Sequence, residues 1–244
     1  MIERQQLNMD IQQFIQDFRE AFGQKVDLPL LFGYSDNPVA ATEKIGGCFF
    51  KGLQAARDGV PVSLNAENIG CGGGKLYTGF ADMPERVPVF VSQKEKYKET
   101  PQMVVDYIDG LGMKRTEKKY LNFVRIDKAE SFDDYEGVLF YATPDVLSGL
   151  CGWAFFDRNE PDAVVARFGS GCSTVVSMTV VENARQGYRC FLGLLDPSVR
   201  PYVKANELGF TIPMSRFTKM METMRQCFLF DSHAWKKMKE RLQE

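Results

Sequence analysis

The chain has very little histidine, no excess of either charge and no long apolar run. A single histidine among 244 residues excludes a metal centre built from several histidines. With 30 Lys and Arg residues against 32 Asp and Glu residues, the net charge of −2 provides no basic field to attract nucleic acid or anionic lipid. No apolar stretch approaches the roughly 20 residues that span a bilayer, so neither nucleic acid nor a membrane is an expected partner.

The six cysteines also lack the spacing of a metal-binding motif. None lies within four residues of another, which excludes the paired spacing of zinc ribbons and ferredoxin-type clusters. The first 22 residues carry no signal-peptide core, and their apolar residues recur at helical spacing. We therefore expect a cytoplasmic protein whose thiols are reduced. The cysteines are Cys48, Cys71, Cys151, Cys172, Cys190 and Cys227.

What the sequence does contain is an ordinary globular composition, with 44% hydrophobic and 25% charged residues. Strand-like and helix-like segments alternate, which predicts a single α/β or α+β domain over residues 1–244, with a mixed sheet flanked by helices. Residues 81–101, rich in Pro, Lys and Glu, are predicted to be an exposed connection. Strands are predicted over 28–34, 60–64, 120–126, 137–142, 163–168, 188–195 and 210–213. Helices are predicted over 1–22, 48–57, 101–111 after the cap Thr100, from Thr143 through Cys151, and in a C-terminal helical region, 214–244.

Two parts of the chain repeat the same order of elements. Residues 28–80 and residues 137–180 each give a strand, a helix, a strand and then a Gly-Cys dipeptide. The two cysteines of the first unit are separated by 22 residues, and those of the second unit by 20. This similarity predicts an internal duplication of a strand–helix–strand–GlyCys unit, with coincidence between two similar α/β segments as the alternative.

The first Gly-Cys dipeptide continues as a glycine-rich turn. Small residues around Cys71 leave its sulfur and the neighbouring amides open to a ligand. Successive amides in such a turn form an anion-binding nest, to which Lys75 adds a positive charge. The spacing is one residue short of a P-loop, and the turn does not match the dinucleotide-binding fingerprint. The glycines of this turn are Gly72, Gly73 and Gly74.

The second Gly-Cys dipeptide lies in GSGCSTVVSMTVVENA, which feeds either a helix or a strand. A helix would place Cys172 at the positive end of its dipole and lower the pKa of the thiol, with Ser173 as an added hydroxyl donor. The β-branched residues that follow favour a strand, which removes that argument. No general base accompanies either cysteine, so a thiol nucleophile lacks its usual partner.

These motifs resemble a known family. Cys71 with its three following glycines, Gly171-Cys172-Ser173, and Asp196-Pro197-Ser198 followed by Arg200 are similar to the domain of unknown function 169 family, a group of uncharacterised archaeal and bacterial proteins. The resemblance covers roughly residues 28–215. It implies no activity, but it implies that Cys71, Cys172, Asp196 and Arg200 are the positions to inspect first. On physical grounds, Arg200 pairs with Asp196 or clamps an anionic group.

These observations leave three functions open. They do not determine the oligomeric state or whether any reaction is catalysed. The first is binding of a small anionic ligand or cofactor between the two Gly-Cys turns. The second is a cysteine-ligated metal or iron–sulfur protein with a redox role, using Cys71 and Cys172, joined by Cys48 and Cys151 if the two units face each other. The third is a thiol-dependent enzyme. The residues expected to bind the small ligand are Cys71, Gly72, Gly73, Gly74, Lys75, Cys172, Ser173 and Arg200.

Overall fold

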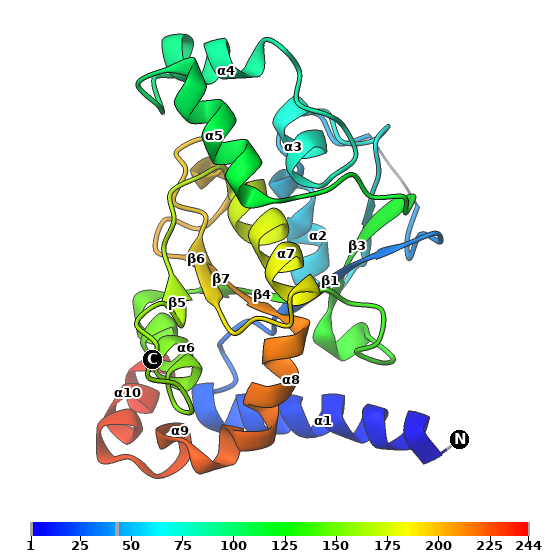
Figure 1. Cartoon of the computed structure of the whole chain (residues 1–244). Helices are drawn as coiled ribbons and strands as arrows, with labels where there is room; N and C mark the ends of the chain where they lie inside the picture. The colour runs from blue at the N-terminus through cyan, green and yellow to red at the C-terminus, as the bar shows by residue number, and fades with distance from the viewer. Residues whose placement is uncertain (1, 42–43, 244) are drawn as a thin grey trace.

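A mixed sheet of seven strands lies between two layers of helices (Figure 1). The structure is a computed structural model that describes residues 2–41 and 44–243. The strand order is β2-β3-β1-β4-β7-β6-β5, and neighbouring strands are antiparallel except for β5 and β6, which are parallel. The mixed sheet with flanking helices confirms the predicted fold class. The strands are β1 (Leu30–Ser35), β2 (Val62–Leu64), β3 (Tyr120–Arg125), β4 (Gly137–Ala142), β5 (Val164–Val165), β6 (Cys190–Gly193) and β7 (Leu208–Pro213).

The centre of the sheet is buried on both faces. Leu30 of β1 lies opposite Leu139 of β4, and the next pair, Leu31 and Val138, points to the other face. Every residue of β4 is buried, so this strand has the continuous apolar sequence that a sheet covered on both sides requires. Side chains on the two faces therefore build two separate hydrophobic clusters.

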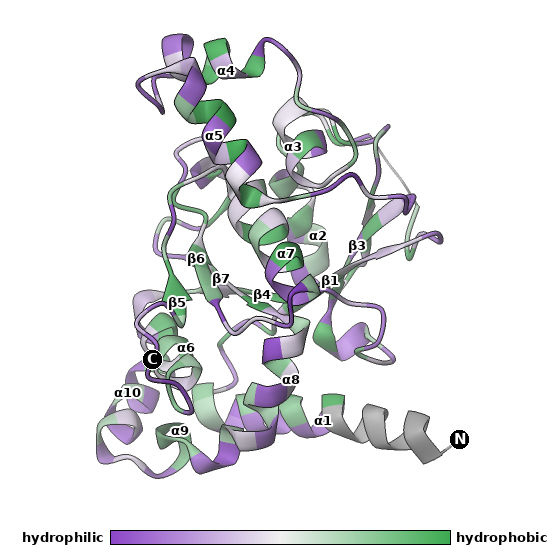
Figure 2. Ribbon diagram, viewed as in Figure 1, coloured by the Kyte–Doolittle hydropathy of each residue, from purple (hydrophilic) through white to green (hydrophobic). Residues whose placement is uncertain are grey.

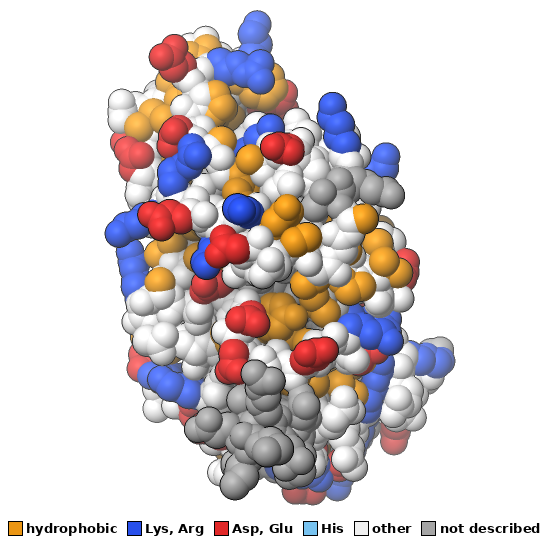
Figure 3. All heavy atoms as spheres, turned by 90° about the vertical axis from the view of Figure 1, so that its right-hand side faces the viewer, with side chains coloured by type: hydrophobic (Ala, Val, Ile, Leu, Met, Phe, Trp, Pro, Cys, Tyr) orange, Lys and Arg blue, Asp and Glu red, His pale blue; other side chains and the backbone are white. Residues whose placement is uncertain are grey.

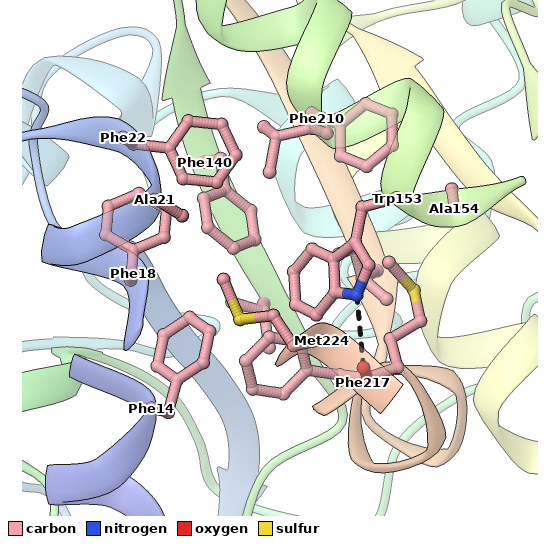
Figure 4. Packing of buried hydrophobic residues seen from close by; sticks show 14 of the residues in the cluster. Phe14, Phe18, Ala21, Phe22, Phe140, Trp153, Ala154, Phe210, Phe217 and Met224 are labelled. Atoms are coloured by element: carbon pink, nitrogen blue, oxygen red, sulfur yellow. Dashed lines mark hydrogen bonds between the residues drawn. The ribbon is translucent and has the colours of Figure 1, made fainter. Parts of the chain in front are cut away.

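The first helical layer covers the face of the sheet that carries Phe140. Phe14 of the N-terminal helix packs edge-on against Phe217, with ring centroids 4.9 Å apart, and the Trp153 indole donates a 3.1 Å hydrogen bond to the carbonyl of Met220 (Figure 4). The elements of this layer are α1 (Ile2–Phe22), η3 (Ile126–Lys128), α6 (Pro144–Ala154), α8 (Met214–Thr223), η6 (Met224–Gln226), α9 (Phe228–Asp231) and α10 (His233–Gln243).

The second helical layer covers the opposite face and holds both Gly-Cys segments. Thr100 caps one of its helices, α5 (Pro101–Leu111), by accepting a 3.2 Å hydrogen bond from the Met103 amide, as the sequence predicts. Figure 2 shows hydrophilic and hydrophobic segments alternating along α5. Its buried side packs against Met178 and against Phe191 of β6. The elements are η1 (Phe49–Lys51), α2 (Leu53–Arg57), α3 (Gly72–Tyr77), α5 (Pro101–Leu111), η4 (Ser173–Ser177), α7 (Met178–Ala184) and η5 (Arg200–Tyr202). Beyond the sheet, α4 (Val87–Val89) and η2 (Phe90–Lys94) lie against α5.

The two units of the predicted duplication occupy related places in the sheet. Their first strands, β1 and β4, are central neighbours, and their second strands, β2 and β5, are the two edges. Their helices α2 and α6, however, cover opposite faces. The duplication therefore stays a prediction. Residues 1, 42–43 and 244 of the predicted domain, and hence two residues of the unit 28–80, lie outside the described residues.

Acidic and basic side chains are intermixed on the face drawn in Figure 3, with hydrophobic side chains between them. This mixture agrees with the small net charge of the sequence.

Over the ranges 2–41 and 44–243, no helix combines the length and the apolar composition needed to cross a bilayer.

Replacing Gly149 of α6 by alanine is expected to destabilise the protein, although alanine favours a helix by about 1 kcal/mol over glycine. The added Cβ would lie 2.3 Å from the ring of Trp235 and 2.6 Å from that of Phe22, and both rings are buried. Since overpacking of a well-filled core costs about 1–3 kcal/mol, we expect urea titration to show a lower free energy of unfolding.

The matched control is Gly110→Ala in α5. The nearest atom to its added Cβ is Nη2 of Arg167, 3.7 Å away, which is ordinary contact. Because the added methyl group makes no close contact, helix propensity determines the effect, and the free energy of unfolding should rise by about 0.5–1 kcal/mol. Equal changes in the two variants would contradict the close packing of α6 against α1 and α10.

Candidate functional site

The first Gly-Cys segment forms the start of a short helix and not an open turn. Cys71 is the N-cap of α3, and its Sγ accepts a 3.5 Å hydrogen bond from the Gly74 amide. Gly72 and Gly73 belong to the first turn of that helix, and none of the three glycines has a positive φ. The segment therefore lacks the left-handed residue typical of a nest, and binding of an anion by its amides stays a prediction. A glycine is needed at position 74 because the Ile69 side chain packs close to its backbone, so that an added Cβ would lie 3.0 Å from that side chain.

The second Gly-Cys segment begins a continuous helical run over residues 171–184, formed by η4 and α7. The strand that its β-branched residues favour is therefore wrong. Val175 and Val176 are fully buried against the sheet, and the Thr174 hydroxyl donates a 3.1 Å hydrogen bond to the carbonyl of Gly171. Packing of this apolar side onto the sheet outweighs the weak intrinsic preference of valine and threonine for strands.

The two segments lie side by side in the second helical layer. The Ser177 hydroxyl donates a 2.6 Å hydrogen bond to the carbonyl of Tyr77, which joins the second helical run to α3. The hydroxyl groups of Ser173 and Tyr107 are 2.8 Å apart, which joins the same run to α5. Three elements that are distant in the sequence are thus held together by hydroxyl groups.

A cavity of about 370 Å³ opens where these three elements meet. Cys71 and Gly73 line it from the first segment, and Gly169 and Ser170 from the second. The remaining walls are mostly aromatic and aliphatic, and several come from the segment between α3 and α5. These apolar walls are Tyr77, Val87, Phe90, Val91, Tyr97, Val104, Tyr107 and Phe168.

The polar groups of the cavity are few and have defined partners. Asp196 follows β6 and is only 5% exposed; its two carboxylate oxygens accept hydrogen bonds of 3.0 and 2.6 Å from the amide and hydroxyl of Ser198. Two cations lie over the ring of Tyr107, with Lys98 Nζ 5.6 Å and Arg167 Cζ 4.6 Å from its centroid. Lys98 also lines the cavity, as does the exposed Glu95, so the site holds two carboxylates and one ammonium group.

The cysteine of the second segment lies behind the cavity wall. Cys172 Sγ is 3.5 Å from the Ser170 hydroxyl, and burial raises the pKa of its thiol to about 12. Although the thiol is at the start of a helical run, the lowered pKa expected from the dipole is therefore wrong. Desolvation disfavours the thiolate more strongly than the helix end favours it. Ser173 also lies behind the wall, where it holds the hydroxyl of Tyr107.

Lys75 and Arg200 are not among the residues that line this cavity. Lys75 is in the last turn of α3 and is half-buried. The guanidinium of Arg200 donates to the backbone of its own loop, with hydrogen bonds of 3.0 and 2.9 Å to the carbonyls of Lys204 and Ala205. The expected pairing of Arg200 with Asp196 is absent from the described salt bridges, because backbone carbonyls take its donors.

The thiols do not converge as the four-cysteine hypothesis requires. Cys48 packs beside Cys71 and Cys172 in the second layer, whereas Cys151 packs with the first layer on the other side of the sheet. Across residues 2–41 and 44–243, no group of three or more His, Cys, Asp or Glu side chains is arranged to hold a metal ion. All six cysteines are free.

The segment 81–101 contributes more to the site than the sequence indicates. It was predicted as an exposed connection, yet it contains α4 and η2 and supplies Phe90, Tyr97 and Lys98 to the cavity. Its Pro, Lys and Glu content conceals a cluster of apolar residues, VPVFV, which was the available signal.

Comparison with known proteins places the chain among proteins without an assigned activity. Residues 32–223 match the family model of domain of unknown function 169, whose description reads "Uncharacterised ArCR". Since the match covers well over half of the chain, the protein belongs to the domain of unknown function 169 family. No curated protein and no solved structure matched the chain.

Proposed function

We propose that this protein binds a small organic ligand in the cavity between its two Gly-Cys segments. The observation that supports this proposal is a cavity of about 370 Å³ with aromatic and aliphatic walls and a few fixed polar groups. That combination is typical of small-molecule sites, in which apolar walls supply affinity and sparse polar groups orient the ligand.

In this proposal, the ligand carries an anionic group that is placed at Lys98. Of the lysines and arginines in the described ranges, Lys98 is the one that lines the cavity. Lys75 and Arg200, which the sequence favours for this role, do not line it. In this proposal, the ligand lies between the two segments, as the sequence predicts, but its anionic group is bound by a lysine of the segment before α5.

Anilinonaphthalene sulfonate, an aromatic anion, is a suitable probe because its fluorescence rises in an apolar site. Phe168→Ala removes one wall and should raise the dissociation constant about fivefold, which corresponds to about 1 kcal/mol of lost ring contact. Phe156→Ala is the matched control, because Phe156 is 42% exposed, close to the 43% of Phe168, but does not line the cavity.

Two further variants test the position of the anion. Lys98→Gln should weaken binding of the same probe, whereas Lys75→Gln should leave it unchanged. Near-ultraviolet circular dichroism establishes that each variant keeps native packing. Equal binding by wild type, Phe168→Ala and Lys98→Gln would overturn the proposal.

A further inference from the structure

Asp196 occupies an unusual position at the edge of the cavity. Its side chain is 5% exposed, and the hydrogen bonds to its carboxylate come from the amide and hydroxyl of Ser198, both neutral donors. Asp196 takes part in none of the salt bridges among the described residues, and the nearby Arg200 is directed to backbone carbonyls. Because these described partners are neutral, a cation or N–H group of a ligand in the cavity would stabilise the Asp196 carboxylate further.

The backbone that carries Asp196 is strained. Leu194, two residues earlier, has a φ of 61°, in the left-handed region that a branched residue rarely adopts. Its fully buried side chain is locked by close packing, since a Cβ added at Gly209 would lie 2.8 Å from Leu194 Cγ. Strain held in place by packing is found at sites whose geometry is needed for function. Here it turns the chain out of β6 and directs Asp196 to the cavity.

The rings around Asp196 suit the same kind of ligand group. Burial is the main cause of the raised pKa of Tyr77, Tyr97 and Tyr107, and the negative charge of Asp196 adds to the shift in all three. The carboxylate is therefore close enough to act on three phenol rings that line the cavity. Aromatic faces beside a carboxylate form the chemical setting that binds a protonated nitrogen, through cation–π contact and a charge-assisted hydrogen bond.

We propose that Asp196 selects a ligand that carries a protonated nitrogen, so that the ligand of this cavity is a zwitterion with its anionic end at Lys98. The inference rests on the proposed function and adds a second charged group of the ligand, the protonated nitrogen, which the proposed function leaves unspecified. It assigns opposite ends of the ligand to two residues of opposite charge that line the same cavity as the aromatic rings.

Three probes with one indole ring and different charges test the inference: tryptophan, tryptamine and indolepropionate. Each is titrated against anilinonaphthalene sulfonate bound to the wild-type protein, and displacement gives its dissociation constant. Wild type should bind tryptophan and tryptamine more tightly than indolepropionate. Asp196→Asn should weaken tryptamine about tenfold, equivalent to about 1.4 kcal/mol, and should not weaken indolepropionate.

Glu95→Gln is the matched control, because Glu95 also lines the cavity but is exposed. It should change tryptamine binding much less than Asp196→Asn does. If Asp196→Asn fails to fold, Ser198→Ala removes the hydroxyl that donates to Asp196 at 2.6 Å, which frees that carboxylate oxygen and should raise the preference for tryptamine over indolepropionate in a folded protein.

The outcomes separate this inference from the proposed function. Probe binding that depends on Phe168 but shows no charge preference, or no displacement by any indole at millimolar concentration, would overturn the role of Asp196 alone. Sulfonate binding that is insensitive to both Phe168→Ala and Lys98→Gln would overturn the cavity as a binding site and the inference with it.

Discussion

Iodoacetamide added to the native protein at pH 8 is expected to alkylate Cys71 far faster than the other five cysteines. Cys71 lines the cavity, so the reagent reaches its sulfur from there. At pH 8, a thiol with a pKa of about 12 is thiolate in about one molecule in ten thousand, and the thiolate is the reacting species. Burial raises the pKa of the thiol to about 12 in Cys172 and Cys190 and to about 11 in Cys48. Burial also raises the thiol pKa of Cys151 and Cys227.

Mass spectrometry of tryptic peptides measures this selectivity directly. A Cys71→Ser variant should lose the fast phase of labelling, and protein denatured in urea should label at every remaining cysteine. Bound anilinonaphthalene sulfonate should slow labelling of Cys71 in the native protein. The structure of the site would be contradicted if Cys172, behind the wall, reacted as fast as Cys71.

Asp157→Ala is expected to lower the free energy of unfolding by about 3 kcal/mol, the lower end of the range for breaking a buried ion pair. Arg216 is completely buried and forms two hydrogen bonds with the Asp157 carboxylate, one of them 2.8 Å long. Without Asp157, the Arg216 guanidinium keeps only neutral partners among the described residues, such as the carbonyl of Ala154 at 3.1 Å and the Cys190 thiol. The lower end applies because the Asp157 side chain is 32% exposed, so water screens part of the interaction.

The double variant Asp157→Ala with Arg216→Met is the control, because removing both charges also removes the unpaired buried cation. It should recover much of the lost stability in urea titrations. If the double variant were as unstable as the single one, loss of packing and not of charge pairing would explain the effect.

The same pair makes stability depend on pH. Hydrogen bonds from Arg216 lower the pKa of Asp157 below its ordinary value of about 3.9, and burial only partly opposes them. Its stabilising contribution is therefore complete above pH 4 and is lost as the pH falls through the lowered pKa of the folded state. Asp157→Asn should lack this part of the acid dependence.

Local sequence signals predicted the elements whose ends are fixed by their own residues. Thr100 and Thr143 each precede a proline and cap the helix that follows, and both helices begin where the sequence indicates. Buried strands such as β4 were likewise visible as short apolar runs. In these elements, local preference and tertiary packing agree.

The site was harder to predict because tertiary contacts determine it. Valines favour strands, yet the run 171–184 is helical because its apolar side covers the sheet. The sequence favours Lys75 and Arg200, which lie in or near recognisable motifs, whereas the cavity is lined by Lys98 from a segment without such a motif. Of the two Gly-Cys dipeptides, Cys71 lines the cavity and Cys172 does not, and the role of both dipeptides in binding stays a prediction.

The central position of β4 affects how the chain folds while it is being synthesised. When β4 leaves the ribosome, its partner β1 is already present, but its other partner, β7, begins only at Leu208. At about 5–20 residues per second, one edge of a fully apolar strand stays unpaired for several seconds. An unpaired apolar edge invites pairing with other chains, so the nascent protein is expected to need chaperone protection during this interval.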